Sequence, residues 1–107
     1  MWSTPEKLAE FMNRRSDGYL PALLGFTLVS ISKESVRARM EIKKHHLAPN
    51  DYLHAASVIA LADTVCGYAT IMNLPEGSGG FTTIELKTNF LGTTRDGAIL
   101  CEGRPAH

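Results

Sequence analysis

The sequence has 107 residues, enough for one domain with a modest core and too few for two. Apolar residues make up 44% and charged residues 21%, which is typical of a soluble globular protein. The 11 basic and 11 acidic side chains cancel and form no basic stripe, which argues against nucleic acid as the main partner. The N-terminus has neither a basic start nor an apolar run, so no signal peptide is expected and a cytoplasmic protein is predicted.

Residues 4–16 are predicted to form a short N-terminal helix. The run STPE at residues 3–6 has a hydroxyl side chain, a proline and an early acid in the order that starts helices. Apolar residues then recur at helical spacing until Asp17 and Gly18 end the segment. We therefore expect one amphipathic helix ahead of the first strand.

Residues 26–43 are predicted to form a pair of antiparallel strands joined by a turn at Lys33 and Glu34. In the second strand, apolar and charged residues alternate almost without exception. This pattern indicates a half-buried strand with one wet face. The apolar positions are Val36, Ala38, Met40 and Ile42, and the charged positions are Arg37, Arg39, Glu41 and Lys43.

Residues 53–73 are predicted to form a long apolar helix. Its length is close to that of a membrane span, but alanines, Ser57, Thr64 and Gly67 dilute its hydrophobicity. A central carboxylate, Asp63, would add roughly 2.5–3.5 kcal/mol to the cost of insertion into a bilayer. A core helix of a protein with no membrane partner is therefore the better interpretation.

Residues 80–106 are predicted to form a second strand pair. Two sets of side chains alternate from Thr82 to Phe90, one mostly apolar and one polar, as in a strand. Residues 92–97 are predicted to form a turn, and residues 98–104 the last strand. The order is helix, strand, strand, long helix, strand, strand. We therefore predict a single α+β domain over residues 1–107, with the long helix packed against an antiparallel sheet.

The long helix has a stripe of large side chains and, roughly opposite, a stripe of small ones that contains Asp63. One interpretation makes Asp63 a structural acid that caps nearby backbone or pairs with a base. The other makes it a partly desolvated carboxylate, a stronger base than in water, that acts on a substrate at a dimer seam. His54 likewise is either a helix-start histidine bonded to local backbone or a catalytic residue. Nine helical residues separate the two by roughly 13 Å, so two antiparallel copies of the helix would be needed to bring them together.

The remaining histidines and the cysteines predict no further chemistry. His45 and His46 are adjacent, but no third ligand stands at a suitable spacing, so we expect solvated side chains and no metal site. Cys66 and Cys101 form no CxxC pair. We expect reduced, partly buried thiols, as is usual in a cytoplasmic protein.

Two runs carry a resemblance: APNDYLHAASVIALADTVCGYA at residues 48–69 and GFTTIELKTNFLGTTRDGAILCEGRPAH at residues 80–107. Together they resemble the hotdog-fold acyl-CoA thioesterases of the phenylacetic-acid-degradation type. The usual pattern of that family is Leu-His-Gly-Gly, eight residues to an acid within Leu-Ala-Asp, then Thr-x-Glu-Leu-Lys-x-Asn-Phe. This chain has His54, Ala55 and Ala56 in place of His-Gly-Gly, Ala48 where Asn or Gln is frequent, and Gly67 where a hydroxyl is frequent.

The resemblance implies a hotdog fold, in which an antiparallel sheet wraps a long helix, and a homodimer or homotetramer with active sites at the subunit seam. It implies that Asp63 promotes attack of water on a thioester and that the backbone N–H of Ala55, assisted by His54, polarises the carbonyl. Its implied substrate-binding residues are Asn50 and Thr64, which would orient the water or the acyl group. Lys87, a strand cation, is a further candidate for substrate binding, toward the phosphates of coenzyme A.

Relatives continue beyond the position of His107 with about two further strands, so a hotdog shortened at its C-terminus is expected. The first functional hypothesis is hydrolysis of an acyl- or aryl-CoA thioester, with coenzyme A as part of the substrate and no separate cofactor. The alternative is a non-catalytic, shortened hotdog module that binds acyl ligands or only oligomerises. A hydratase on the same fold fits the spacing of His54 and Asp63 less well.

Overall fold

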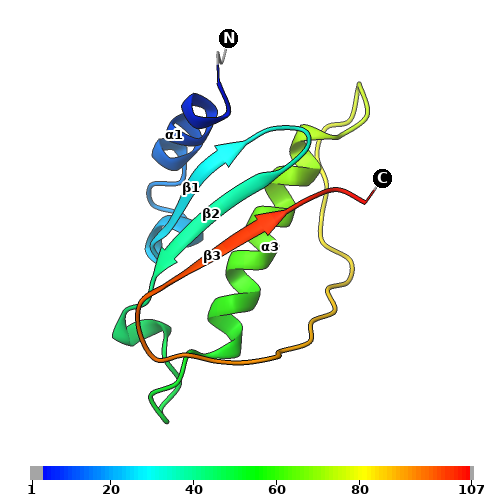
Figure 1. Cartoon of the computed structure of the whole chain (residues 1–107). Coiled ribbons are helices and arrows are strands. Elements are labelled where there is room, and N and C mark those ends of the chain that lie inside the picture. Colours follow the sequence, from blue (N-terminus) through cyan, green and yellow to red (C-terminus); the bar gives the residue numbers. More distant parts are fainter. Residues whose placement is uncertain (1–3, 107) are drawn as a thin grey trace.

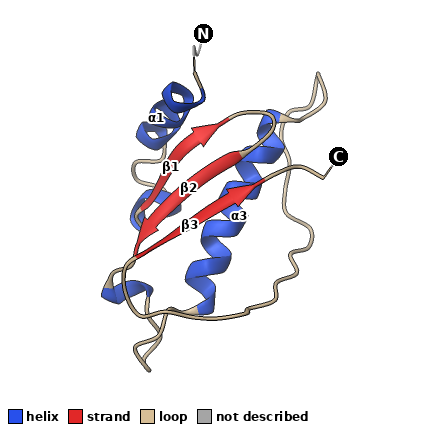
Figure 2. Ribbon diagram, viewed as in Figure 1, coloured by secondary structure: helices blue, strands red, loops and turns tan. Residues whose placement is uncertain are grey.

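The computed structural model describes residues 4–106. One antiparallel sheet with strand order β1-β2-β3 lies over the long helix α3, with α1 at the far side of β1 (Figures 1 and 2). This is the α+β arrangement that the sequence predicts. The elements, in chain order, are α1 (Pro5–Arg15), α2 (Leu20–Leu23), β1 (Phe26–Ile31), β2 (Val36–Glu41), the 3-10 turn η1 (Lys44–His46), α3 (Ala55–Met72) and β3 (Ala98–Gly103).

The N-terminal helix α1 begins and ends close to its predicted positions. The Oγ1 of Thr4 accepts the backbone N–H of Lys7 at 3.1 Å, and a proline occupies the first turn. The side chain of Asn13 then clamps Leu28 of β1: it accepts the Leu28 N–H at 2.8 Å and donates to the Leu28 carbonyl at 2.9 Å. These two bonds occupy part of the outer edge of β1, which would otherwise expose unpaired backbone groups.

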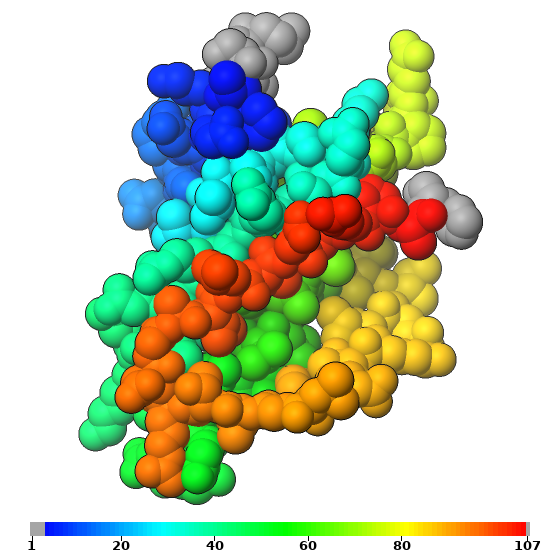
Figure 3. All heavy atoms as spheres, viewed as in Figure 1, coloured from blue at the N-terminus to red at the C-terminus, as the bar shows by residue number. Residues whose placement is uncertain are grey.

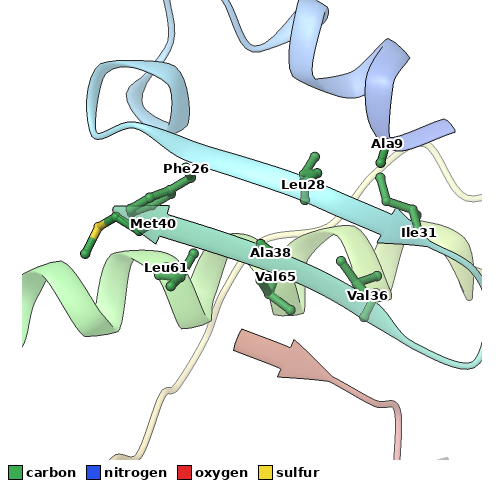
Figure 4. Packing of buried hydrophobic residues seen from close by; sticks show 10 residues of the cluster. Ala9, Phe26, Leu28, Ile31, Val36, Ala38, Met40, Leu61 and Val65 are labelled. Carbon is green, nitrogen blue, oxygen red and sulfur yellow. The ribbon is translucent and has the colours of Figure 1, made fainter. Parts of the chain in front are cut away.

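The predicted strand pair is confirmed as β1 and β2, which pair in antiparallel register from Phe26 opposite Met40 to Ile31 opposite Val36. In β2 the burial of side chains alternates along the strand, as its sequence pattern predicts. Its buried face packs on α3, whose inner side is formed by Leu61, Val65 and Ala69 (Figure 4). Full burial of a side chain such as Leu61 or Val65 contributes roughly 1.5–3 kcal/mol to the free energy of folding, so this contact is a main source of stability.

The helix α3 covers most of the predicted range 53–73. By length and composition it could cross a membrane, with a mean hydropathy of 1.5. Its inner side packs on a sheet of the same chain, and 22% of the helix is buried in this way. The predicted stripe of large side chains consists of Val58, Leu61, Val65, Tyr68 and Met72. Of these, Leu61 and Val65 are buried, whereas Tyr68 and Met72 are only partly buried.

The predicted second strand pair is wrong in its first half. Residues 98–103 form β3, which pairs with β2 in antiparallel register. Residues 78–94 form no helix or strand, and no backbone–backbone hydrogen bond within the described chain involves residues 79–93. Alternating side chains produce a strand only where a neighbouring backbone supplies hydrogen bonds, and no such neighbour lies beside residues 82–90 within residues 4–106.

This unpaired segment carries large apolar side chains in contact with solvent. Ile84 is 95% exposed and Leu91 is 97% exposed, and on β3 Leu100 is 78% exposed. The second edge of β3 has no partner strand among the described residues. Figure 3 shows a hollow between β3 and the segment, with α3 at its floor.

The close packing of β3 on α3 requires a glycine at position 103. A Cβ at this position would lie 2.7 Å from Cγ1 of Val65, which is fully buried and has a stiff, branched side chain. β3 and α3 therefore approach each other too closely for any larger residue here.

We expect Gly103→Ala to lower the free energy of unfolding by about 1–3 kcal/mol, because Val65 or β3 must move to admit the methyl group. Gly79→Ala is the matched control, because a Cβ there meets nothing within 4 Å and its backbone is not in the left-handed region. The measurement is urea unfolding of both variants. Equal midpoints for the two would show that β3 is not packed as described.

Candidate functional site

The N-terminus of α3 is capped by His54. Its backbone is extended, its Nδ1 accepts the N–H of Ala56 at 2.9 Å, and its carbonyl accepts the N–H of Ser57 at 3.0 Å. The interpretation of His54 as a helix-start histidine bonded to local backbone is therefore confirmed. The ring is exposed and its Nε2 makes no bond within residues 4–106, so this nitrogen faces outward for any second role.

The N–H of Ala55, the first residue of α3, has no acceptor in the described part of the chain. The next two N–H groups are both taken by His54. A helix N-terminus with an unused N–H favours developing negative charge, through this donor and through the helix dipole. The methyl groups of Ala55 and Ala56 are exposed, so alanines in place of glycines cause no clash within one chain.

Asp63 lies in the middle of α3 and is partly buried. Its Oδ1 accepts a hydrogen bond from the hydroxyl of Thr83 at 3.1 Å. Within residues 4–106, no backbone N–H and no basic side chain is bonded to this carboxylate, so the interpretation of Asp63 as a capping or ion-paired structural acid is not supported. One carboxylate oxygen is thus oriented by a neutral donor, and the other is available.

Two cavities flank this carboxylate. One, of about 290 Å³, runs along residues 81–86, and the other, of about 250 Å³, is bordered by Pro21 and Ile71. Asp63, Gly67 and Phe81 line both. The ring of Phe81 lies over Gly67, since a Cβ at this position would be 3.4 Å from its Cζ. A methyl group at position 67 would therefore be in contact with the aromatic ring.

The three predicted substrate-binding residues are not brought together. Thr64 lines the smaller cavity with Asp63, although its hydroxyl donates to the carbonyl of Ala60 at 2.8 Å. Asn50 is exposed and its side chain accepts the N–H of Tyr52 at 3.2 Å. Lys87 has an 85% exposed side chain and lies 3.9 Å from Glu85. Neither Asn50 nor Lys87 lines a cavity beside Asp63.

Within one chain, the structure also keeps His54 and Asp63 apart. Both lie on the same continuous helix, with nine residues and therefore roughly 13 Å between them. Sequence analysis missed Phe81 and Thr83 as site residues. The signal for Thr83 is that it begins the Thr-x-Glu-Leu-Lys motif, which we used for the fold and for Lys87 alone, and Phe81 lies two residues before it.

The prediction of solvated histidines is wrong for His46, which is 1% exposed, and correct for His45. Sequence alone did not reveal this difference because both histidines stand in a polar run between the second strand and the long helix. Similarly, Cys101 is a partly buried free thiol as predicted, whereas Cys66 is exposed.

Burial raises the pKa of the Cys101 thiol, and a negative charge on nearby Cys66 raises it further. A raised pKa leaves less thiolate at a given pH, and the thiolate is the reactive form.

We therefore expect Cys66 to react first with a disulfide reagent at pH 8 and Cys101 to react more slowly. Absorbance traces of wild type and Cys66→Ser test this order. A fast phase that persists in Cys66→Ser would contradict it.

Comparison with known proteins identifies the family and the fold of the chain. The family model described as "Thioesterase superfamily" matches residues 50–107, which include α3 and β3. No curated protein matches the sequence at a significant level.

Solved structures show the same fold. A mutant thioesterase PA1618 from Pseudomonas aeruginosa superposes with a TM-score of 0.85 at 23% identity, over 92% of this chain and 71% of that one. The thioesterase HI1161 from Haemophilus influenzae superposes with a TM-score of 0.84 at 22% identity, over 92% of this chain and 68% of that one. Zebra fish thioesterase superfamily member 2 superposes with a TM-score of 0.76 at 17% identity, over 94% of this chain and 74% of that one. The chain has the hotdog fold of these enzymes and belongs to the thioesterase superfamily.

Proposed function

We propose that this chain hydrolyses acyl- or aryl-CoA thioesters by means of a water molecule activated by Asp63. The observation that carries the proposal is the carboxylate itself. It is held by Thr83 through one oxygen, is bonded to no backbone group of residues 4–106, and lies at the border of two cavities. The apolar residues Pro21 and Ile71 beside one cavity are suited to an acyl or aryl group.

In the proposed reaction, Asp63 takes a proton from water while the water oxygen attacks the thioester carbonyl carbon. The unused N–H of Ala55 stabilises the negative charge that develops on the carbonyl oxygen. The C–S bond then breaks, and the proton passes from Asp63 to the leaving thiolate of coenzyme A. No separate cofactor is needed, because coenzyme A is part of the substrate.

The proposal requires two chains, since Ala55 and Asp63 are separated by roughly 12 Å on one helix. A homodimer or homotetramer with α3 helices in antiparallel contact would set the N-terminus of one helix beside Asp63 of the other. The open face of α3 supports this arrangement, because Cys66, Thr70 and Ile71 on that face are exposed. The exposed ammonium group of Lys87 is our candidate for contact with the phosphates of coenzyme A. We also propose a cytoplasmic location, where acyl-CoA esters occur.

The second candidate function is a non-catalytic hotdog module that binds acyl ligands or only oligomerises. The unpaired edge of β3 and the exposed apolar segment beside it favour this candidate, because an incomplete sheet leaves the cavities open to water. Absence of turnover on acyl-CoA thioesters, together with ligand-dependent thermal stabilisation, would select it.

We expect Asp63→Asn to lower thioester hydrolysis by about 10²–10⁴-fold, because the amide cannot accept the proton from water. Thr83→Val should have a smaller effect, since it removes the hydroxyl that orients the carboxylate and leaves the base. The measurement is thiol release from a panel of acyl- and aryl-CoA esters, with circular dichroism as the control for folding. Full turnover by Asp63→Asn would exclude the proposed mechanism.

A mixing experiment tests the shared site. Homodimers of Asp63→Asn lack the base, and homodimers of His54→Ala lack the residue that assists the Ala55 N–H, so each should hydrolyse thioesters much more slowly. A mixed dimer contains one site with both native residues. Random assembly of equal amounts should therefore restore about a quarter of wild-type activity. Refolding the two variants together and separately provides the comparison. If the mixture is no more active than the separate variants, the two residues do not meet across an interface.

A further inference from the structure

His46 is a buried polar side chain whose ring makes two hydrogen bonds. Its Nδ1 accepts the backbone N–H of Lys43 at 2.9 Å, and its Nε2 lies 2.6 Å from the carbonyl oxygen of Leu24. The tautomer that suits both partners is neutral, with the proton on Nε2 donated to Leu24. The ring therefore connects η1 to the residue that ends α2, just ahead of β1.

The backbone of the same residue holds the first turn of α3. The carbonyl of His46 accepts the N–H of His54 at 3.0 Å and the hydroxyl of Ser57 at 2.9 Å. These two donors stand on either side of Ala55, whose N–H has no acceptor within residues 4–106. The bonds to the His46 carbonyl thus hold the backbone on both sides of the free N–H, in addition to the bonds that His54 makes to Ala56 and Ser57.

We propose that His46 is a positioning residue, which fixes the N-terminal turn of α3 to the corner between α2 and β1 and so aims the N–H of Ala55. The inference rests on the proposed function, in which this N–H meets the thioester carbonyl. A group that stabilises developing charge must be placed before the reaction, and an error of about 1 Å costs about 10²-fold in rate. A ring bonded at both nitrogens and packed at 1% exposure is suited to this task.

The kinetic test compares three variants. His46→Phe fills the space but loses both ring bonds, whereas the amide of His46→Gln offers an acceptor for Lys43 and a donor for Leu24. Met40→Ala is the control for stability alone, because Met40 is a fully buried core residue with no part in this bonding. All variants are assayed well below their melting temperatures, with kcat and KM determined separately.

We expect His46→Phe to lower kcat by about 10–10²-fold with little change in KM. His46→Gln should recover part of the loss, and Met40→Ala should keep its kcat. If His46→Phe and Met40→Ala retain the same kcat, His46 only stabilises the fold and the inference is wrong.

Hydrogen exchange tests the inference without relying on catalysis. In His46→Phe, the backbone N–H groups of Ala56 and Ser57 should exchange about tenfold faster or more, while those of Leu61 and Val65 change no more than in Met40→Ala. Unchanged exchange at the first turn would overturn the positioning role. If wild type hydrolyses no thioester, the proposed function fails, and the exchange rates still decide whether His46 holds this turn.

Discussion

The packing of one side of α3 on the inner face of β2 is the contact on which the rest of the structure depends. It buries Leu61 and Val65 of the helix among the alternating apolar residues of the strand, and it leaves no room for a side chain at position 103 of β3. Because a helix with one side fixed against a sheet cannot turn about its axis, this contact determines which residues point away from the core. Asp63 lies about 200° around the helix from Leu61, so it faces away from the sheet for a reason that concerns packing and not catalysis.

The same contact explains how a short chain presents two different chemical groups. The N-terminus of α3 extends past the sheet (Figure 1), where His54 accepts two of its N–H groups and that of Ala55 has no acceptor within residues 4–106. The middle of the helix presents Asp63 beside residues 81–86. The helix keeps these two groups roughly 12 Å apart, so only the proposed second helix, running in the opposite direction, would bring them together.

Elements whose pattern depends on contacts close in sequence were predictable. The hairpin of β1 and β2 follows from the alternation in β2 and the turn at Lys33 and Glu34, and the limits of α1 and α3 follow from caps and composition. Residues 82–90 show equally good alternation, yet they form no strand, because pairing depends on a neighbouring backbone that a local pattern cannot guarantee. His46 and Thr83 were missed for a related reason. Their partners, Leu24 and Asp63, lie 22 and 20 residues away in sequence, and no spacing rule connects them.

The open face of α3 has a physical consequence for the candidate site. A carboxylate acts most strongly on its surroundings where water is excluded, because Coulombic interactions grow as the effective dielectric constant falls. The larger of the two cavities beside Asp63 is bordered by residues 81–86, whose apolar side chains include the 95% exposed Ile84. Any surface that covered this segment would remove water from the carboxylate and would also bury the exposed apolar groups. The favourable free energy of that burial would then stabilise the proposed oligomer. Assembly of the chains and exclusion of water from the surroundings of Asp63 would occur together.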